Sequence, residues 1–328
     1  MAASIAVPES QEQEPAAHQQ PVVSMRSVTK VFGEVEALRA LDLEIQPGEI
    51  VGVIGPSGSG KTTTIRLMLG LYQPTEGDVL VGGVDPAPFT APDREKIGYL
   101  PQHFLLYPDL TAEENIRFVA GTYGLGWRVR RRRVRELLAL VELTDAQHRQ
   151  AAKLSGGMQR RLALACALVH EPAFIVLDEP TAGQDPVLRQ HLWDVFRSLQ
   201  AQGRTFVVTT QYVTEAEYCD RVVLIDHGRA AAQGTPEELR RKAFGGDVVR
   251  VVVPDLDRSL VNALGDLPFT HRTEWRGEDE LLLMVDDAGS AIPVITQTVR
   301  DRGSVVTSIE EFRQPFDRVF VQLVQDAE

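Results

Sequence analysis

The chain has 328 residues, with 46 acidic and 34 basic side chains and a formal net charge of −12. A chain of this length is too long for one ordinary small domain and is about right for two domains. The acidic balance argues against a general nucleic-acid binder, so we expect no nucleic-acid partner. Its two cysteines, Cys166 and Cys219, are too few and too isolated for a disulfide framework or a metal site, and we expect both to pack as small apolar residues.

Residues 1–21 contain no Lys or Arg and no apolar core, and they are rich in Gln, Glu, Ala and Pro. That composition argues against a secretory signal and predicts a disordered tail. No stretch of the chain approaches the roughly 18 apolar residues that span a bilayer. If the protein works at a membrane, another chain must supply the spanning part, and we expect this chain itself to be cytoplasmic.

The first predicted elements are strands at 22–32 and 37–45. The apolar run 50–54 then leads into Gly-Pro-Ser-Gly-Ser-Gly-Lys-Thr at 55–62, which fits the phosphate-loop pattern G-x-x-x-x-G-K-[ST]. A helix is predicted after this run, ending at Gly70. The order of strand, loop and helix is the context that this motif requires, and it argues against a chance glycine-rich turn.

Glycines in this loop let backbone N–H groups curl around phosphate oxygens, and the helix start adds free donors and a partial positive charge. We expect Lys61 to reach the β- and γ-phosphates and Thr62 to offer its hydroxyl to Mg²⁺. The predicted nucleotide-binding residues of the loop are Gly55, Pro56, Ser57, Gly58, Ser59, Gly60, Lys61, Thr62 and Thr63.

Short strands at 77–81 and 97–100 precede a helical stretch, whose first helix begins with a capping box between Thr111 and Glu114. The next predicted helix, 127–140, carries six arginines: Arg128, Arg130, Arg131, Arg132, Arg133 and Arg135. A nucleic-acid or anionic-lipid contact is one interpretation of this run. A solvated helix with its leucines packed inward is the interpretation that we favour from the sequence.

The segment 174–179 is a predicted apolar strand that ends in two carboxylates, Asp178 and Glu179. A carboxylate at this position can hold Mg²⁺ through water, and we assign that role to Asp178. Glu179 points elsewhere and can orient an attacking water or take its proton. Just before this strand, Ser155 is a candidate N-cap of a helix that runs to about Val169.

The remaining elements alternate between helix and strand. They are a helix at 185–200 with Pro at its first position, a strand at 205–210, a short helix at 215–219, a strand at 221–226 and a helix from 235. Such alternation predicts an α/β fold with a mainly parallel sheet and helices on both faces.

Beyond Gly245-Gly246 the pattern restarts. The predicted elements are strand 247–253, helix 257–264, strands 268–274 and 280–285, helix 290–302, strand 304–310 and helix 316–324. This is a βαββαβ order resembling a ferredoxin-like unit, with one helix added. It has no glycine-rich loop and no cluster of catalytic residues, so we interpret it as a regulatory or docking domain.

One further motif lies between the phosphate loop and the acidic strand. The run Leu-Ser-Gly-Gly-Met-Gln at 154–159 places Ser155, Gly156 and Gly157 at a helix start, where hydroxyl, backbone N–H groups and helix dipole all favour phosphate. With these three motifs in this order, residues 22–240 resemble the ATP-binding cassette of an ABC transporter. The family pattern is Leu-Ser-Gly-Gly-Gln, and Met158 takes its last place here.

The resemblance implies several further roles. In the family, the Ser155 motif acts on ATP held by the opposite subunit, so a second copy of the cassette is an implied partner. Phe32 occupies the position where an aromatic ring stacks on adenine, although a core Phe is nearly as good an interpretation. Gln102 occupies the Q-loop, which contacts Mg²⁺ and faces the transmembrane partner. Gln184 replaces the more usual Leu of the D-loop.

The largest departure is at the switch position, where the family has His and this chain has Gln211. An amide can donate a hydrogen bond to the γ-phosphate but cannot become cationic near neutral pH. The run Thr-Thr-Gln-Tyr at 209–212 resembles the branch of daunorubicin/doxorubicin-type export ATPases. Residues 247–325 resemble the C-terminal extension of those proteins, with their end pattern loosely present at 315–320.

Taken together, the resemblance implies a P-loop ABC cassette at 22–244, with a helical subdomain at about 103–170, followed by an α+β accessory domain at 245–328. The implied function is hydrolysis of ATP with Mg²⁺, catalysed by Glu179, Lys61 and Gln211, with Thr62, Gln102 and Asp178 around the metal. Two copies would power export by a separate integral-membrane permease, from the inner face of the cell membrane.

Two alternatives remain. A soluble ABC protein of DNA repair or translation would carry a long coiled coil or a second cassette, and this chain shows neither pattern. An ATP-binding regulator with weak turnover is the other alternative, and Gln211 is the residue that motivates it.

Overall fold

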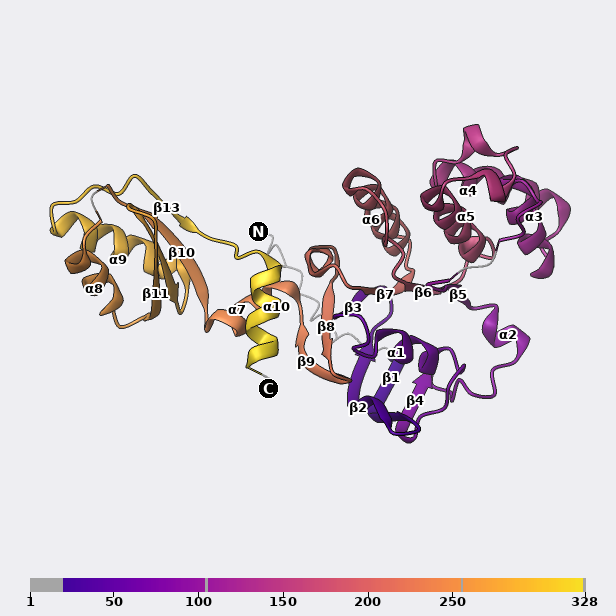
Figure 1. Cartoon of the computed structure of the whole chain (residues 1–328), viewed down its shortest axis with the longest axis horizontal. Helices are drawn as coiled ribbons and strands as arrows, with labels where there is room; N and C mark the ends of the chain where they lie inside the picture. The colour runs from indigo at the N-terminus through magenta and orange to yellow at the C-terminus, as the bar shows by residue number, and fades with distance from the viewer. Residues whose placement is uncertain (1–19, 104–105, 255, 327–328) are drawn as a thin grey trace, which may run out of the picture.

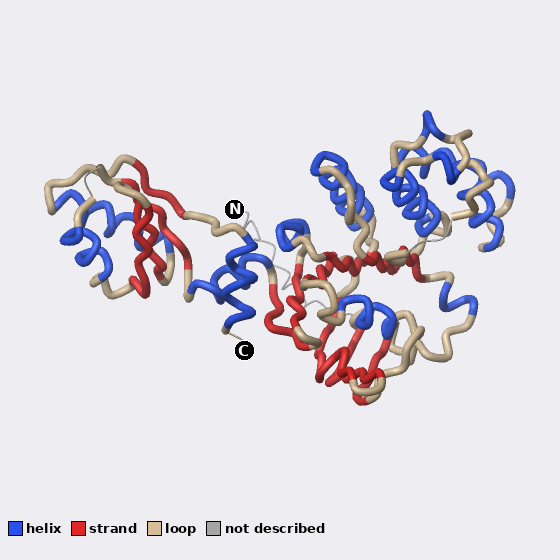
Figure 2. Tube along the Cα trace, in the orientation of Figure 1, coloured by secondary structure: helices blue, strands red, loops and turns tan. Residues whose placement is uncertain are grey.

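The computed structural model describes residues 20–103, 106–254 and 256–326. The predicted tail at 1–21 lies outside this range except for its last two residues. Figure 1 shows an elongated chain, with a group of helices at one end, strands in the middle and a second α+β unit at the other end. Figure 2 shows the same division by secondary structure.

The central sheet has six strands in the order β5-β6-β7-β3-β8-β9. Their bounds are β3 Ile50–Ile54, β5 Ile97–Leu100, β6 Phe174–Asp178, β7 Thr205–Thr210, β8 Arg221–Asp226 and β9 Arg229–Gly234. The first five run parallel, and β9 is antiparallel to β8. The mainly parallel α/β sheet predicted from the sequence is confirmed. The sequence did not reveal β9, because its Ala-rich run has low strand propensity.

A second, antiparallel sheet has the order β2-β1-β4, with β1 Val23–Phe32, β2 Val35–Ile45 and β4 Glu76–Val81. Helix α1, Lys61–Met68, lies between this sheet and the central one. Its buried Ile65 and Met68 share one hydrophobic cluster with residues of β1, β3 and β7. This packing fixes the start of α1 directly above the end of β3.

Three helices form the group at one end of the molecule in Figure 1: α3 Ala112–Thr122, α4 Trp127–Leu140 and α5 Gly156–Leu168. The predicted capping box is present, because Thr111 accepts from the Glu114 N–H and Glu114 accepts from the Thr111 N–H. Three short helices were not predicted: α2 Ala91–Arg94 and the 3₁₀ helices Thr144–Ala146 and Ala151–Lys153. Cys166 and Cys219 are free thiols in the apolar core on this side of the sheet, as expected.

Helix α6, Pro186–Gln200, begins as predicted, with Asp185 capping the N–H of Leu188 and Pro at its first position. The predicted short helix at 215–219 is instead a 3₁₀ helix at Val213–Tyr218. Its turn is tightened because the next strand starts only three residues later, at Arg221.

The C-terminal unit contains β10 Asp247–Val252, α8 Arg258–Gly265, β11 Thr270–Arg276, β12 Glu280–Val285, α9 Ala288–Asp301 and β13 Ser308–Glu311. The strands pair antiparallel in the order β11-β12-β10-β13, and α8 and α9 pack on one face of the sheet. This is the predicted βαββαβ order. Strand β13 starts at Ser308 rather than at 304, because only residues 308–311 pair with β10.

The last helix, α10 Phe316–Gln325, leaves this unit and returns to the cassette. It packs on α7, Pro236–Phe244, and on the 3₁₀ helix that follows β7. Its buried residues Phe316, Val319 and Leu323 belong to the same apolar cluster as the core of the cassette. Buried residues from 50–243 and from 316–323 therefore share one apolar cluster.

Candidate functional site

The phosphate loop connects β3 to α1, and its backbone needs glycine. Gly58 and Gly60 have φ values of 82° and 114°, in the left-handed region that L side chains rarely adopt. A Cβ on Gly60 would lie 2.7 Å from the carbonyl oxygen of Ala37, and one on Gly55 would lie 2.0 Å from that of Ile225. The loop is thus held close to neighbouring backbone. The hydroxyl of Ser59 is buried and has no hydrogen-bond partner among the residues that the structure describes, and a phosphate oxygen could satisfy it.

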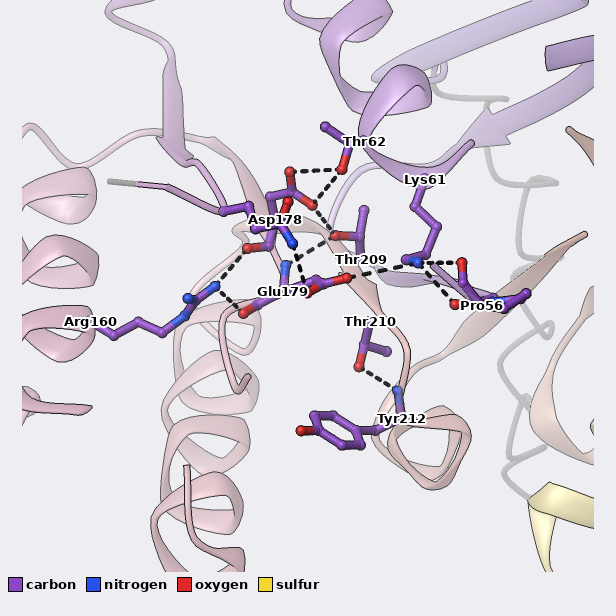
Figure 3. Close-up of polar contacts among 11 residues, drawn as sticks. Pro56, Lys61, Thr62, Arg160, Asp178, Glu179, Thr209, Thr210 and Tyr212 are labelled. Carbon is purple, nitrogen blue, oxygen red and sulfur yellow. Dashed lines mark hydrogen bonds and ion pairs between the residues drawn. The ribbon is translucent and has the colours of Figure 1, made fainter. Parts of the chain in front are cut away.

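Lys61 is the first residue of α1 and is nearly buried. Its Nζ donates to the carbonyl oxygens of Gly55 and Pro56, both at 2.9 Å, and lies 3.8 Å from Oε1 of Glu179 (Figure 3). Burial lowers the pKa of Lys61, and the nearby carboxylates of Glu179 and Asp178 oppose that shift. The ammonium is therefore held at the mouth of the loop, between loop carbonyls and the end of β6.

Asp178 ends β6, and its carboxylate is 1% exposed. Thr62 Oγ1 donates to its Oδ2 at 3.1 Å, and Thr209 Oγ1 donates to its Oδ1 at 2.6 Å. Figure 3 shows these three side chains pointing toward one another from α1, β6 and β7. A buried carboxylate beside a hydroxyl is the oxygen donor set that Mg²⁺ prefers, so Thr62 and Asp178 fit the ion.

Thr209 was missed by the sequence analysis. Its signal was present, because Thr209 is the last residue but one of a strand parallel to the one that ends in Asp178. The carboxyl ends of parallel strands lie at one edge of the sheet. Thr209 binds Glu179 as well as Asp178. The N–H of Glu179 donates to both the carbonyl oxygen and Oγ1 of Thr209, each at 3.0 Å.

Glu179 has a φ of 51°, an uncommon backbone conformation for a residue with a side chain. The turn directs its carboxylate away from that of Asp178 and toward Lys61 and Gln102. Gln102, which follows β5, donates from Nε2 to Oε2 of Glu179 at 3.2 Å. The structure thus brings together five of the predicted site residues: Lys61, Thr62, Gln102, Asp178 and Glu179.

Arg160, one turn into α5, holds the same turn from the other side (Figure 3). It donates from Nε to the carbonyl oxygen of Pro180 at 3.0 Å and from Nη2 to those of Asp178, at 2.9 Å, and Glu179. Burial lowers the pKa of its guanidinium, and the two carboxylates oppose that shift. Sequence reasoning missed this role and had no signal for it, because a helical Arg is usually a solvated one.

The predicted phosphate-binding residues on α5 lie at its start. Ser155 is the N-cap and accepts from the N–H of Met158 at 3.3 Å. Ser155 and Gly156 are exposed, and a Cβ on Gly156 would meet open space. A Cβ on Gly157 would lie 2.9 Å from Oε1 of Gln184. This end of α5 belongs to the helical group that Figure 1 draws apart from α1.

Two other predicted residues are placed at the surface. Phe32 ends β1 and is 41% exposed, with its ring edge-on to Tyr72 at 5.1 Å between centroids and Lys30 Nζ at 4.9 Å. Phe32 is therefore not a core residue, and its stacking on adenine stays a prediction. Gln211 follows β7 directly, and its side chain is exposed.

Comparison with known proteins identifies the family. Residues 38–182 match the ABC transporter family. The chain is 40% identical over 259 residues to the Nod factor export ATP-binding protein I of Cupriavidus metallidurans, covering 78% of this chain and 84% of that protein. The chain belongs to the ATP-binding proteins of ABC transporters. It is also 36% identical over 253 residues to the probable multidrug ABC transporter ATP-binding protein YbhF of Escherichia coli, covering 77% of this chain and 43% of that protein.

Solved ABC cassettes have the same fold. A structure described as the ATP-binding subunit of an ABC transporter has a TM-score of 0.62 at 31% identity, covering 68% of this chain and 93% of that one. A dimeric, post-hydrolysis structure of the cassette MJ0796 bound to ADP and Pi has a TM-score of 0.60 at 32% identity, covering 65% of this chain and 98% of that one. The chain is accordingly an ABC-type ATPase. Among the helices that the structure describes, none is long and apolar enough to cross a membrane.

Proposed function

We propose that this ABC ATPase hydrolyses ATP at the cluster formed by Lys61, Thr62, Gln102, Asp178 and Glu179, and that this reaction powers export through a separate membrane-spanning partner. The observation that carries the proposal is the convergence of a buried ammonium, a buried carboxylate and a second, outward-turned carboxylate at the mouth of one phosphate loop. Asp178 and Glu179 lie in different surroundings, so one carboxylate can hold Mg²⁺ while the other activates a water.

In the proposed reaction, the loop N–H groups and Lys61 bind the β- and γ-phosphates and stabilise the charge that develops on the leaving oxygen. Glu179 orients a water in line with the γ-phosphorus and accepts its proton as the new P–O bond forms and the bridging P–O bond breaks. Mg²⁺, held by Thr62 and Asp178 with Gln102 beside it, would neutralise phosphate charge. Phe32 would stack on the adenine.

The exposed start of α5 is not used by this cluster. We assign Ser155, Gly156 and Gly157 to the γ-phosphate of ATP bound by a second copy of the chain, so that two copies close over two nucleotides. The dimeric form of MJ0796 and the curated relatives' names, Nod factor export and multidrug transport, support a dimeric export ATPase. The permease would hold this dimer at the inner face of the cell membrane.

The role of Glu179 is tested by Glu179→Gln in the purified full chain, with phosphate release as the readout. We expect turnover to fall about 10²- to 10⁴-fold, because the amide cannot accept the proton. Binding of ATP should be retained, since Gln keeps the shape of the side chain. Glu278→Gln, at an exposed carboxylate of the C-terminal unit, is the matched control. Turnover of the Glu179→Gln variant equal to that of the control would refute the assignment.

Gln211 favours one second candidate, an ATP-binding regulator with weak turnover. At this position an amide can donate to a phosphate oxygen but adds no positive charge. Gln211→His is the test. If wild-type turnover is near zero and the variant restores it, the regulator is favoured; if the wild type turns over and the variant changes its rate less than about tenfold, the export ATPase stands.

The partner is tested by purifying the tagged chain from native membranes in mild detergent and identifying what co-purifies. A stoichiometric protein with several membrane spans is the expected result. Recovery only in the soluble fraction would refute the transport function while leaving the ATPase assignment intact.

A further inference from the structure

Helix α4 carries the densest run of positive charge in an otherwise acidic chain, and the hydrolysis site makes no use of it. Two of its six arginines are bound within the fold. Arg130 donates to the carbonyl oxygen of Leu125 at 3.0 Å. Arg133 donates to the carbonyl oxygen of Leu168 at 3.1 Å and pairs with Glu136 and Glu171. These two have structural roles.

The other four arginines form a stripe on one face of the helix. Arg128, Arg131, Arg132 and Arg135 are all exposed, and their spacing of i, i+3, i+4 and i+7 places them on adjacent turns over about 10 Å. The adjoining arc of the helix packs into the core through Val134, Leu137 and Leu138.

Only one member of the stripe forms an ion pair within the described part of the chain. Arg132 Nε lies 3.5 Å from Glu136, and that carboxylate is shared with Arg133. Arg128, Arg131 and Arg135 form no hydrogen bond or ion pair with any residue in the described ranges 20–103, 106–254 and 256–326. A helix that is only solvated gains stability from ion pairs between residues four apart. The arginine face of α4 has few such pairs.

Apolar side chains flank the stripe at the start of α4. Trp127 is 69% exposed and Val129 is 40% exposed. An exposed Trp beside arginines is a poor fit to bulk water, but it fits the boundary of a lipid bilayer, where the ring lies at the level of the head groups. The helix is part of the group at one end of the molecule, so the surface is accessible (Figure 1).

We propose that the stripe of Arg128, Arg131, Arg132 and Arg135, with Trp127 and Val129 beside it, binds the surface of a membrane that contains anionic phospholipids. The guanidinium groups pair with lipid phosphate and carboxylate oxygens, and the Trp127 ring enters the head-group layer. A nucleic acid is a poorer fit, because the basic face is short and the exposed Trp127 and Val129 beside it suit a lipid head-group layer.

Binding to lipid in this way requires neither ATP nor the permease, so the inference does not depend on the proposed function. If the chain hydrolyses ATP but does not bind vesicles, only the lipid-binding inference fails. If it binds vesicles but does not hydrolyse ATP, only the proposed function fails.

The test is co-sedimentation of the purified full chain with vesicles of phosphatidylcholine alone and of phosphatidylcholine mixed with phosphatidylserine. We expect binding only to the anionic vesicles, weakening as salt is raised. Replacing the four arginines of the stripe by Gln should lower the partition coefficient by about fivefold for each Arg removed. Trp127→Ala should weaken binding without changing the charge.

The matched control replaces four scattered, exposed arginines by Gln: Arg26, Arg229, Arg258 and Arg300. It changes the net charge equally but leaves the stripe intact, so it should bind as the wild type does. Retained ATPase activity shows that each variant is folded. The proposal is overturned if the stripe variant and the control bind equally, if phosphatidylcholine alone binds as well, or if duplex DNA or RNA competes the chain off the vesicles.

Discussion

Thr209 offers the sharpest test of the site's construction, because its one hydroxyl connects the Asp178 carboxylate to the backbone of Glu179. It donates to the Asp178 carboxylate at 2.6 Å and accepts from the Glu179 N–H at 3.0 Å. Thr209→Val replaces this hydroxyl by a methyl of nearly the same size. The change therefore creates no cavity and removes only the polar contacts.

The expected loss follows from those contacts. A hydrogen bond to a charged group contributes about 1.5–3 kcal/mol, and Asp178 is buried, with Thr62 as its other hydroxyl donor. The Glu179 N–H keeps its bond to the Thr209 carbonyl oxygen, so the second lost contact adds little. We expect a loss of about 2 kcal/mol, which corresponds to a fall in Tm of about 4–8 °C.

Turnover should fall as well, by about ten- to a hundredfold, because the carboxylate is no longer fixed in orientation. Differential scanning calorimetry and a phosphate-release assay measure the two effects. Thr209→Ser, which keeps the hydroxyl, is the control and should retain most of the thermal stability and most of the turnover. If the Val variant matches the wild type in Tm and turnover, or if the Ser variant loses as much as the Val variant, the hydroxyl does not have this role.

Two further predictions concern stability. Burial lowers the pKa of His170, whose Nε2 lies 3.1 Å from the carbonyl oxygen of Ile97 and whose ring stacks on Tyr123. Between that lowered pKa and about 6.5 the unfolded chain binds more protons, so stability should fall as pH drops through this window. His170→Phe should flatten the dependence of Tm on pH. If the slope of Tm against pH is unchanged, other groups cause the pH dependence. Phe316 is buried where α10 packs on the cassette, so Phe316→Ala should cost about 3–5 kcal/mol of unfolding free energy in denaturant titration. Val321→Ala, at an exposed position of the same helix, is its control and should change little; equal losses would mean that α10 does not stabilise the core.

Sequence by itself determined the features that depend on neighbouring residues. The phosphate loop, the apolar strand ending at Asp178 and the caps at Thr111, Ser155 and Asp185 are all short-range patterns. Each reports local backbone geometry, such as a left-handed glycine or a helix start, and the structure has each of these elements where the pattern predicts it. The order of these motifs along the chain was enough to indicate the family.

Tertiary structure alone decided which distant residues meet. Thr209 reaches Asp178 because β6 and β7 end side by side, and Arg160 reaches the turn after β6 because the start of α5 lies beside that turn. Helix α10 returns from the end of the chain to the cassette core, although the glycine pair at 245–246 marked a break in the sequence pattern. The division of the α4 arginines into bound and exposed ones likewise depends on what packs beside each. Such contacts join segments that are far apart in sequence, and the hydrophobic periodicity of one segment carries no information about its partner.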